Sequence, residues 1–164
     1  MIYSDSSHSW LEYAQKLSNK EDIYARFIIS YIALLVFCSK NKLYSDHYEI
    51  DIYKIDKKYN HKYINIDEKS KIKLAIDELI LYFKTAGVKS LQYPSYPSKD
   101  KEQELHRLDK WGEVGNAVNF VMKVRNNLIH GGKEFDADEH SRNFKLVKLA
   151  LDIIEGLNDS LFNK

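Results

Sequence analysis

The chain has 164 residues, of which 44% are hydrophobic, and its 25 basic and 24 acidic side chains give a formal net charge of +1. This length and composition fit a single compact domain over residues 1–164 and argue against a disordered tail or a two-domain enzyme. The balanced charge argues against a protein that coats DNA through a broad basic field, so any contact with nucleic acid should be local.

Two further features favour a cytoplasmic location without a membrane partner. The single cysteine, Cys38, lies in an apolar run, which excludes an internal disulfide framework and favours a reducing compartment. Residues 1–5 are polar and lack the pattern of an export signal. The most apolar stretch, residues 27–38, is shorter than the roughly 20 residues that span a bilayer.

Helical periodicity begins near the N-terminus. Apolar residues at helical spacing between Trp10 and Leu17 predict a first short helix. A second helix follows over residues 23–38. It is apolar on nearly every side, so we expect it in the middle of a bundle or at a subunit interface.

Residues 40–65 interrupt this pattern. They contain five tyrosines among many lysines and aspartates, with a brief polar–apolar alternation over residues 48–53. We interpret them as an inserted connection that can hold a short strand pair. Tyrosines interleaved with lysines can stack on unpaired bases, but the balanced charge favours a solvated insert whose tyrosines cover the bundle.

The rest of the chain predicts three further long helices and a shorter one. A third helix covers residues 72–83, introduced by Asp67 and ended at Gly87. A loop containing Pro94 and Pro97 follows, and residues 99–110 predict a short surface helix.

A fourth helix is predicted over residues 114–128 and ends at the pair Gly131 and Gly132. The final helix carries apolar residues from Phe144 to Leu161, behind Asp136, whose spacing to Glu139 fits a reciprocal cap. The predicted architecture is all-α, a bundle of four to five principal helices with a Tyr/Lys-rich insertion.

The most informative segment lies at the end of the fourth predicted helix. It contains Arg125, Asn126, Asn127 and His130. Arginine is a permanent cation with a planar fork of donors, and histidine has the side-chain pKa nearest neutrality. Together they suit binding and proton transfer at a phosphodiester without a metal ion.

Helical geometry indicates how these residues could meet. Arg125 lies about 140° from His130 around the helix axis, whereas Asn126 lies about 40° from it. One helix alone does not bring the Arg125 and His130 heads together easily. A second copy of the helix, antiparallel across a two-fold axis, would bring both pairs to one cleft, so the spacing favours a homodimer through this helix.

Residues 125–130, Arg-Asn-Asn-Leu-Ile-His, resemble the arginine–polar–histidine motif of HEPN domains, the higher eukaryote and prokaryote nucleotide-binding superfamily. Residues 27–33 are similar to the aromatic-rich second helix of the Apea-like branch. The resemblance implies a helical bundle that dimerises through its motif helices and, in catalytic members, cleaves RNA without a metal or other cofactor. Arg125 and His130 would be the catalytic pair, and Asn126 would orient them.

The resemblance also implies a biological role. HEPN ribonucleases act as toxins or antiviral defence effectors, so an antitoxin or a defence-system protein is an expected partner. One position departs from the pattern: members silenced by nucleotide addition carry a tyrosine two residues after the histidine, where this chain has Gly132. Silencing by modification of that tyrosine is therefore not expected.

Other interpretations stay open. Arg125 could be a solvated surface group and His130 could cap helix carbonyls, in which case the chain would be a non-catalytic HEPN-like module that binds nucleotide, RNA or a partner protein. Asn127, Lys133 and Glu113 are secondary candidates for substrate binding. Four residues near 136–140 could ligate a cation but fit helix capping better, so no metal site is expected: Asp136, Asp138, Glu139 and His140.

Overall fold

The computed structural model describes residues 22–47, 49–85, 113–130 and 140–162, and for residues 82–85 and 130 it describes the backbone alone. Within these residues the structure is helical apart from short turns and one isolated antiparallel bridge between Tyr44 and Ile50. The helices are α2 (Ile23–Lys40), α3 (Ile52–Tyr63), α4 (Lys71–Thr85), α6 (Glu113–His130) and α7 (Arg142–Leu157), followed by a π-helical turn over Asn158–Phe162. The all-α prediction is confirmed.

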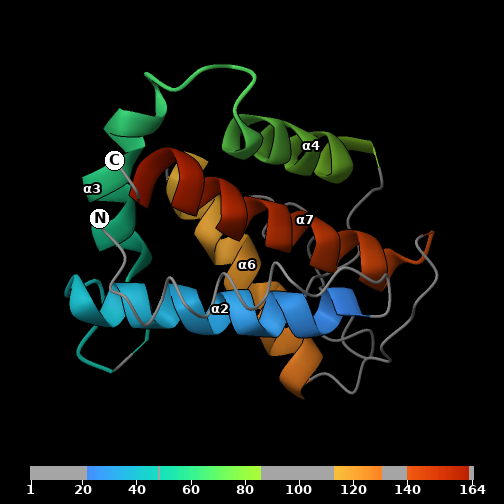
Figure 1. Ribbon diagram of the computed structural model, residues 1–164, viewed down its shortest axis with the longest axis horizontal. Coiled ribbons are helices and arrows are strands. Elements are labelled where there is room, and N and C mark those ends of the chain that lie inside the picture. The colour runs from blue at the N-terminus through green and yellow to red at the C-terminus, as the bar shows by residue number, and fades with distance from the viewer. Residues whose placement is uncertain (1–21, 48, 86–112, 131–139, 163–164) are drawn as a thin grey trace.

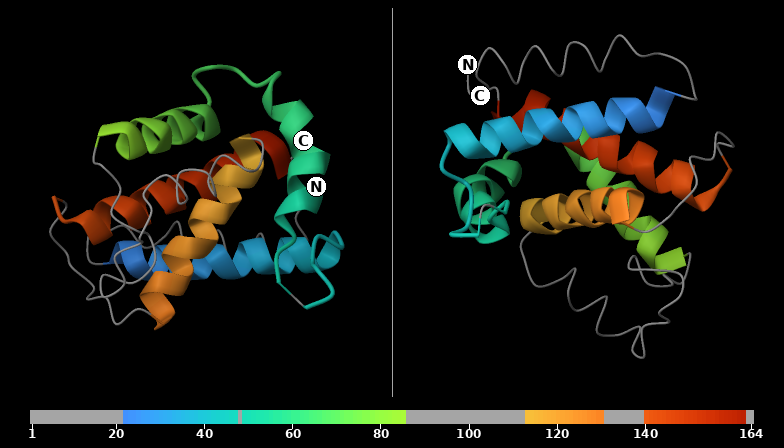
Figure 2. Two further views of the ribbon diagram at one scale, coloured as in Figure 1. Left: turned by 180° about the vertical axis from the view of Figure 1, so that it is seen from behind. Right: turned by 90° about the horizontal axis from the view of Figure 1, so that it is seen from below.

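The helices pack around α7 (Figure 1). α7 lies against α2 on one side and α4 on the other, and α6 crosses behind both α2 and α7. α3 stands at one end of the molecule, packed against the N-terminal half of α6. This arrangement leaves the C-terminal end of α6 projecting past α2 (Figure 2).

α2 is the most apolar helix described, as its sequence predicts. Phe27, Leu34 and Phe37 have no exposed surface. Over its 18 residues the mean hydropathy is 1.6, which makes α2 the one described helix long and apolar enough to cross a bilayer by these criteria. Half of it is buried within the protein, and the core helix of a globular domain passes the same test.

The interpretation of residues 40–65 as an inserted connection is wrong for its second half, which is helix α3. Asp51 caps this helix by accepting a hydrogen bond from the Lys54 backbone N–H at 3.1 Å. Ile55, Tyr59 and Tyr63 then recur every four residues and are buried against the core. The expected strand pair is reduced to the single Tyr44–Ile50 bridge.

The described helix starts also differ from the predicted ones. α4 begins at Lys71 behind Ser70, whose Oγ accepts a hydrogen bond from the Lys73 N–H, and not directly after Asp67. α7 begins behind Ser141, whose Oγ accepts a hydrogen bond from the Phe144 N–H at 3.1 Å. Several predicted features lie outside the described residues: the helix between Trp10 and Leu17, the stop at Gly87, the loop with Pro94 and Pro97, the helix over 99–110, the stop at Gly131 and Gly132, and the cap formed by Asp136 and Glu139.

Near its C-terminal end α7 makes close contacts to α4 and α2. A Cβ atom added to Gly156 would lie 2.7 Å from the backbone N and Cα of Ile72, so only glycine allows α4 to approach this closely. The neighbouring Glu155 carboxylate accepts a hydrogen bond from Arg26 of α2 at 2.9 Å and another from Lys71 of α4. One acidic side chain therefore joins three helices.

Candidate functional site

Arg125 and Asn126 lie near the C-terminal end of α6 and contact each other. Nη1 of Arg125 donates a hydrogen bond to Oδ1 of Asn126 at 2.7 Å, and the contact is exposed to solvent. An arginine carries five N–H donors, of which this bond uses one. The structure thus brings together two of the three residues that the sequence assigns to catalysis, at a position a substrate can reach.

Tyr31 of α2 forms the second support for Arg125. The guanidinium carbon lies 5.3 Å from the centroid of the Tyr31 ring, a cation–π distance. Tyr31 is only 6% exposed. Burial raises the pKa of its phenol to about 12, although the positive charge of Arg125 acts in the opposite direction. The ring is therefore neutral at physiological pH and offers the cation its π face.

The sequence assigned no role to Tyr31. The residue belongs to the segment over 27–33 that resembles the HEPN second helix, but the pattern does not tell which aromatic ring meets Arg125. That contact depends on where α6 crosses α2 (Figure 2). The sequence could have indicated that an aromatic residue of this segment contacts Arg125. Only the crossing of α6 and α2 shows that this residue is Tyr31.

His130 is the last residue of α6, so the motif ends a helix as the sequence predicts. Its backbone is described and its side chain is not, and Lys133 lies outside the described residues. Five residues of helix separate Arg125 from His130, which corresponds to about 7.5 Å along the axis.

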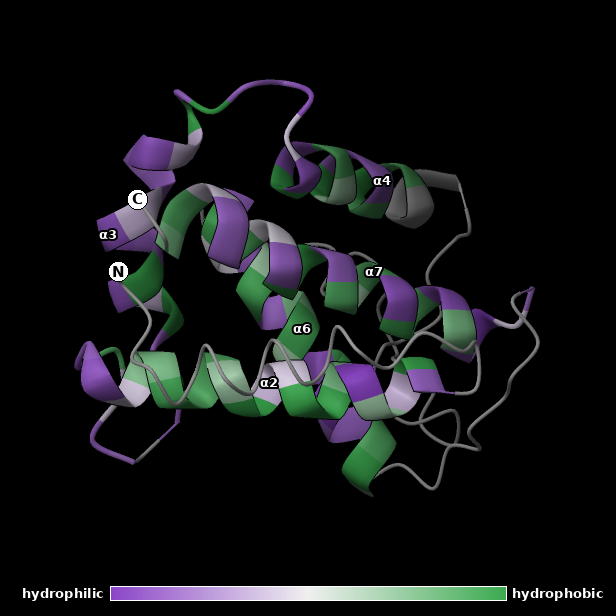
Figure 3. Cartoon of the chain, viewed as in Figure 1, coloured by the Kyte–Doolittle hydropathy of each residue, from purple (hydrophilic) through white to green (hydrophobic). Residues whose placement is uncertain are grey.

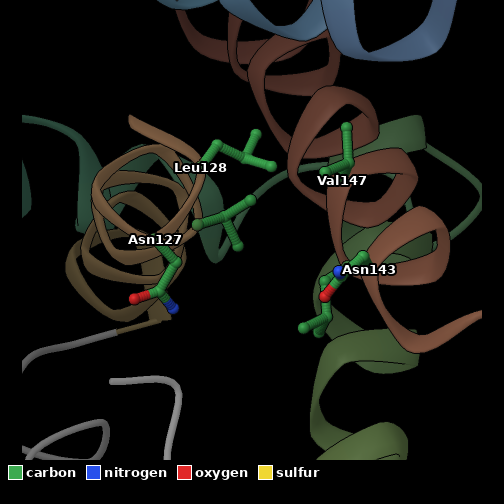
Figure 4. A pocket seen from close by; sticks show the side chains of 6 residues that line it. Asn127, Leu128, Asn143 and Val147 are labelled. Atoms are coloured by element: carbon green, nitrogen blue, oxygen red, sulfur yellow. The ribbon is translucent and has the colours of Figure 1, made fainter. Parts of the chain in front are cut away.

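Asn127 lies apart from the Arg125–Asn126 pair. It is 8% exposed and, about 200° around the axis from Arg125, faces α7. With Asn143 across from it and apolar side chains around both, it lines a small hollow between α6 and α7 (Figure 4). The hollow has room for about 10 Å³, enough for one water molecule and too little for a nucleotide. Asn127 therefore lies between α6 and α7, apart from the exposed Arg125–Asn126 contact.

Glu113 lies at the opposite end of α6 from the motif. It is the first residue of the helix, about 18 Å along the axis from Arg125. Glu113 contacts Tyr63 of α3, whose phenol donates a hydrogen bond to the Glu113 carboxylate. Burial raises the pKa of Tyr63, and the negative charge of Glu113 raises it further. The structure therefore separates Glu113 from the residues with which the sequence grouped it.

Residues able to ligate a metal do not gather in the described part of the chain. Across residues 22–47, 49–85, 113–130 and 140–162 no group of three or more His, Cys, Asp or Glu side chains could hold an ion. Of the acidic run near residue 140, only the exposed His140 falls within the described residues; Asp136, Asp138 and Glu139 do not.

The arrangement suits an anion-binding role at the end of α6. A guanidinium held between an aromatic face and an amide keeps its planar fork in a fixed direction, and this fork matches the oxygens of a phosphate. Placing the groups near a helix C-terminus adds no attraction for an anion, since the helix dipole is negative there. The positive charge of Arg125 must therefore supply the attraction.

The chain matches no family model, no curated protein and no solved structure.

Proposed function

We propose that this protein is a metal-independent endoribonuclease of the HEPN type, which cleaves RNA at a site shared by two copies of α6. Arg125, Asn126 and His130 are the proposed catalytic residues. The observation that carries the proposal is the contact of the Arg125 guanidinium with both the Tyr31 ring and the Asn126 amide, five residues before the helix-terminal His130. The proposed role is a toxin or an antiviral defence effector in the cytoplasm.

The proposed chemistry uses only groups that RNA and the motif provide. The RNA 2′-OH attacks the adjacent phosphorus, a new P–O bond forms, and the bond to the 5′-oxygen of the next nucleotide breaks. His130 takes up the proton of the hydroxyl or delivers one to the leaving oxygen. Arg125 stabilises the charge that develops on the phosphoryl oxygens. DNA lacks the hydroxyl and is not cleaved.

The test is cleavage of single-stranded RNA in the presence of a chelator. We expect His130→Ala to lower the rate constant by about 10²- to 10⁴-fold and Arg125→Ala by about 10²- to 10³-fold. Lys145→Ala, which also removes an exposed cation but lies on α7, is the matched control and should leave the rate unchanged. Cleavage by both motif variants at the wild-type rate, or no cleavage by the wild type, would sink the proposal.

The shared site is tested by mixing the two inactive variants. If one site takes Arg125 from one protomer and His130 from the other, dimers formed between Arg125→Ala and His130→Ala chains contain one intact site and regain part of the activity. Recovery that depends on subunit exchange supports the shared site. A mixture as inactive as its components shows that both residues act within one protomer.

The alternative is a non-catalytic helical module that binds RNA, and a specific observation favours it as the second candidate. The outer face of α3 carries four exposed lysines beside an exposed tyrosine. Wild-type protein that binds RNA but does not cleave it under any of these conditions would select this alternative.

A further inference from the structure

α3 exposes a face of one charge sign. Its buried side consists of Ile55, Tyr59 and Tyr63. The lysine face, as we call the outer side, consists of Tyr53, Lys54, Lys57, Lys58 and Lys62, all exposed. Figure 3 shows the contrast between this mostly hydrophilic helix and the apolar α2.

The one carboxylate within α3 is directed away from the lysine face. Asp56 is half-buried, and its Oδ1 accepts a hydrogen bond from the Gly115 N–H at 3.0 Å at the start of α6. The next carboxylates along the chain, Asp67 and Glu68, lie in the turn beyond the helix. Of the lysines on this face, Lys54 forms an ion pair with the capping Asp51, and no carboxylate within α3 itself faces the others.

The lysine heads are partly held in place. Nζ of Lys54 donates a hydrogen bond to the Tyr44 carbonyl at 2.6 Å and lies 3.7 Å from the capping Asp51. Nζ of Lys58 and Nζ of Lys62 lie 5.4 Å and 5.5 Å from the centroid of the Tyr59 ring. Like charges four residues apart repel each other on a helix, and a polyanion across the face relieves that repulsion.

Single-stranded RNA fits this surface better than a membrane does. A helix that binds a lipid surface must insert its apolar side, and the apolar side of α3 is already buried in the core. Binding of an unpaired strand combines cations along the phosphates with an aromatic ring on which a base stacks. Tyr53, 58% exposed at the start of α3, provides such a ring beside the lysines.

We propose that the lysine face binds the phosphate backbone of single-stranded RNA, with a base stacked on Tyr53. As a substrate-docking surface it rests on the proposed function. The Asn60 side chain and Asp56 join α3 to the first residues of α6, at Val114 and Gly115. Arg125 lies about 16 Å further along the same helix, a span that a strand of a few nucleotides covers.

The test measures binding separately from cleavage. A fluorescently labelled 12-residue oligouridine is titrated with the His130→Ala protein, with and without Lys57→Gln/Lys62→Gln, across a range of salt concentrations. We expect the double change to weaken binding on the order of tenfold at low salt. The slope of log K against log salt should fall by about 1.4, that is about 0.7 per lost phosphate contact. Tyr53→Ala should weaken binding about fivefold or more, with little change in slope.

The matched control removes two exposed lysines from the N-terminal half of α7, which lies away from α3 (Figure 1): Lys145→Gln/Lys148→Gln. Unchanged affinity and slope in the α3 variant, or an equal loss in the α7 control, would overturn the inference. The two proposals fail separately. RNA binding through the lysine face without cleavage by the wild type contradicts the ribonuclease alone, and cleavage with binding unaffected by the α3 changes contradicts the docking surface alone.

Discussion

At the scale of single residues, the position of Arg125 is the feature most relevant to chemistry. Holding an arginine in one geometry costs up to about 2 kcal/mol of side-chain entropy. The cation–π contact with Tyr31 contributes about 0.5–1 kcal/mol, and the hydrogen bond to Asn126 about 0.5–1.5 kcal/mol, so together they offset most of that cost. A phosphate arriving at this guanidinium meets donors that are already oriented.

A first prediction concerns Tyr31 as a positioning residue. In the ribonuclease assay, Tyr31→Leu should lower kcat about two- to fivefold, the equivalent of the lost cation–π contact, with a smaller effect on KM. Tyr31→Phe retains the aromatic face and should restore most of the rate. Tyr24→Leu, at another buried tyrosine of α2, should lower the melting temperature without this loss of kcat. Equal effects of the Leu and Phe substitutions at Tyr31 would contradict the role.

At the scale of helices, the sequence predicts some elements well. α2 and α6 have continuous apolar periodicity, and their bounds agree with the prediction to within two residues at both ends of each helix. The sequence analysis did not predict α3, because the alternation over residues 48–53 is typical of strands and because α3 contains many lysines. Ile55, Tyr59 and Tyr63 nevertheless stand at helical spacing behind the capping Asp51, so the signal was present.

Gly156 gives a prediction at this scale. In most helix interiors, replacing glycine by alanine stabilises the fold by about 1 kcal/mol through helix propensity. Here the added methyl group would meet the backbone of Ile72 at 2.7 Å, and backbone cannot move aside as a flexible side chain can. We expect Gly156→Ala to lower the free energy of unfolding, measured in urea, by about 1–3 kcal/mol.

The control for this prediction is Lys145→Ala, an exposed change in the same helix, which should stay within about 0.5 kcal/mol of wild type. A Gly156→Ala protein as stable as the wild type would show that α4 can shift away from α7 at little cost.

At the scale of the whole molecule, specific side-chain contacts join segments that are distant in the sequence. The Glu155 carboxylate links α2 and α4 to α7 through Arg26 and Lys71. The aromatic rings of Phe37, Tyr59 and Phe162 pack together, with centroids of Phe37 and Phe162 4.1 Å apart. Such contacts explain why the candidate site was only partly predictable. The sequence locates Arg125 and Asn126, but the partner Tyr31 follows from the crossing of two helices.

Buried ionisable groups predict how stability depends on pH. Burial raises the pKa of Cys38 from 9.0 to about 12 and that of Tyr31 from 10.0 to about 12. The folded protein therefore holds protons that the unfolded chain releases. The free energy of unfolding should be constant below pH 9 with respect to these groups and should fall between pH 9 and 12, by up to about 1.4 kcal/mol per pH unit for each group.

Urea unfolding at a series of pH values, followed by circular dichroism, measures this loss. Between pH 9 and 10 Cys38 makes the largest single contribution to the difference in proton uptake, because its unfolded pKa of 9.0 lies below the 10.0 of the tyrosines whose pKa is also raised. Cys38→Ala should therefore show a shallower decline in that window. A decline of the same steepness in the variant would assign the alkaline instability to other groups.

The packing of Phe162 has a consequence for synthesis of the protein. Phe162 stacks on Phe37, a residue made 125 positions earlier, and also touches Tyr59. At about 5–20 residues per second, a ribosome needs roughly 6 to 25 s between these two residues. During that time α2, the most apolar helix described, lacks the Phe162 ring that packs on its Phe37. The nascent chain should therefore depend on chaperones until Phe162 has left the ribosome.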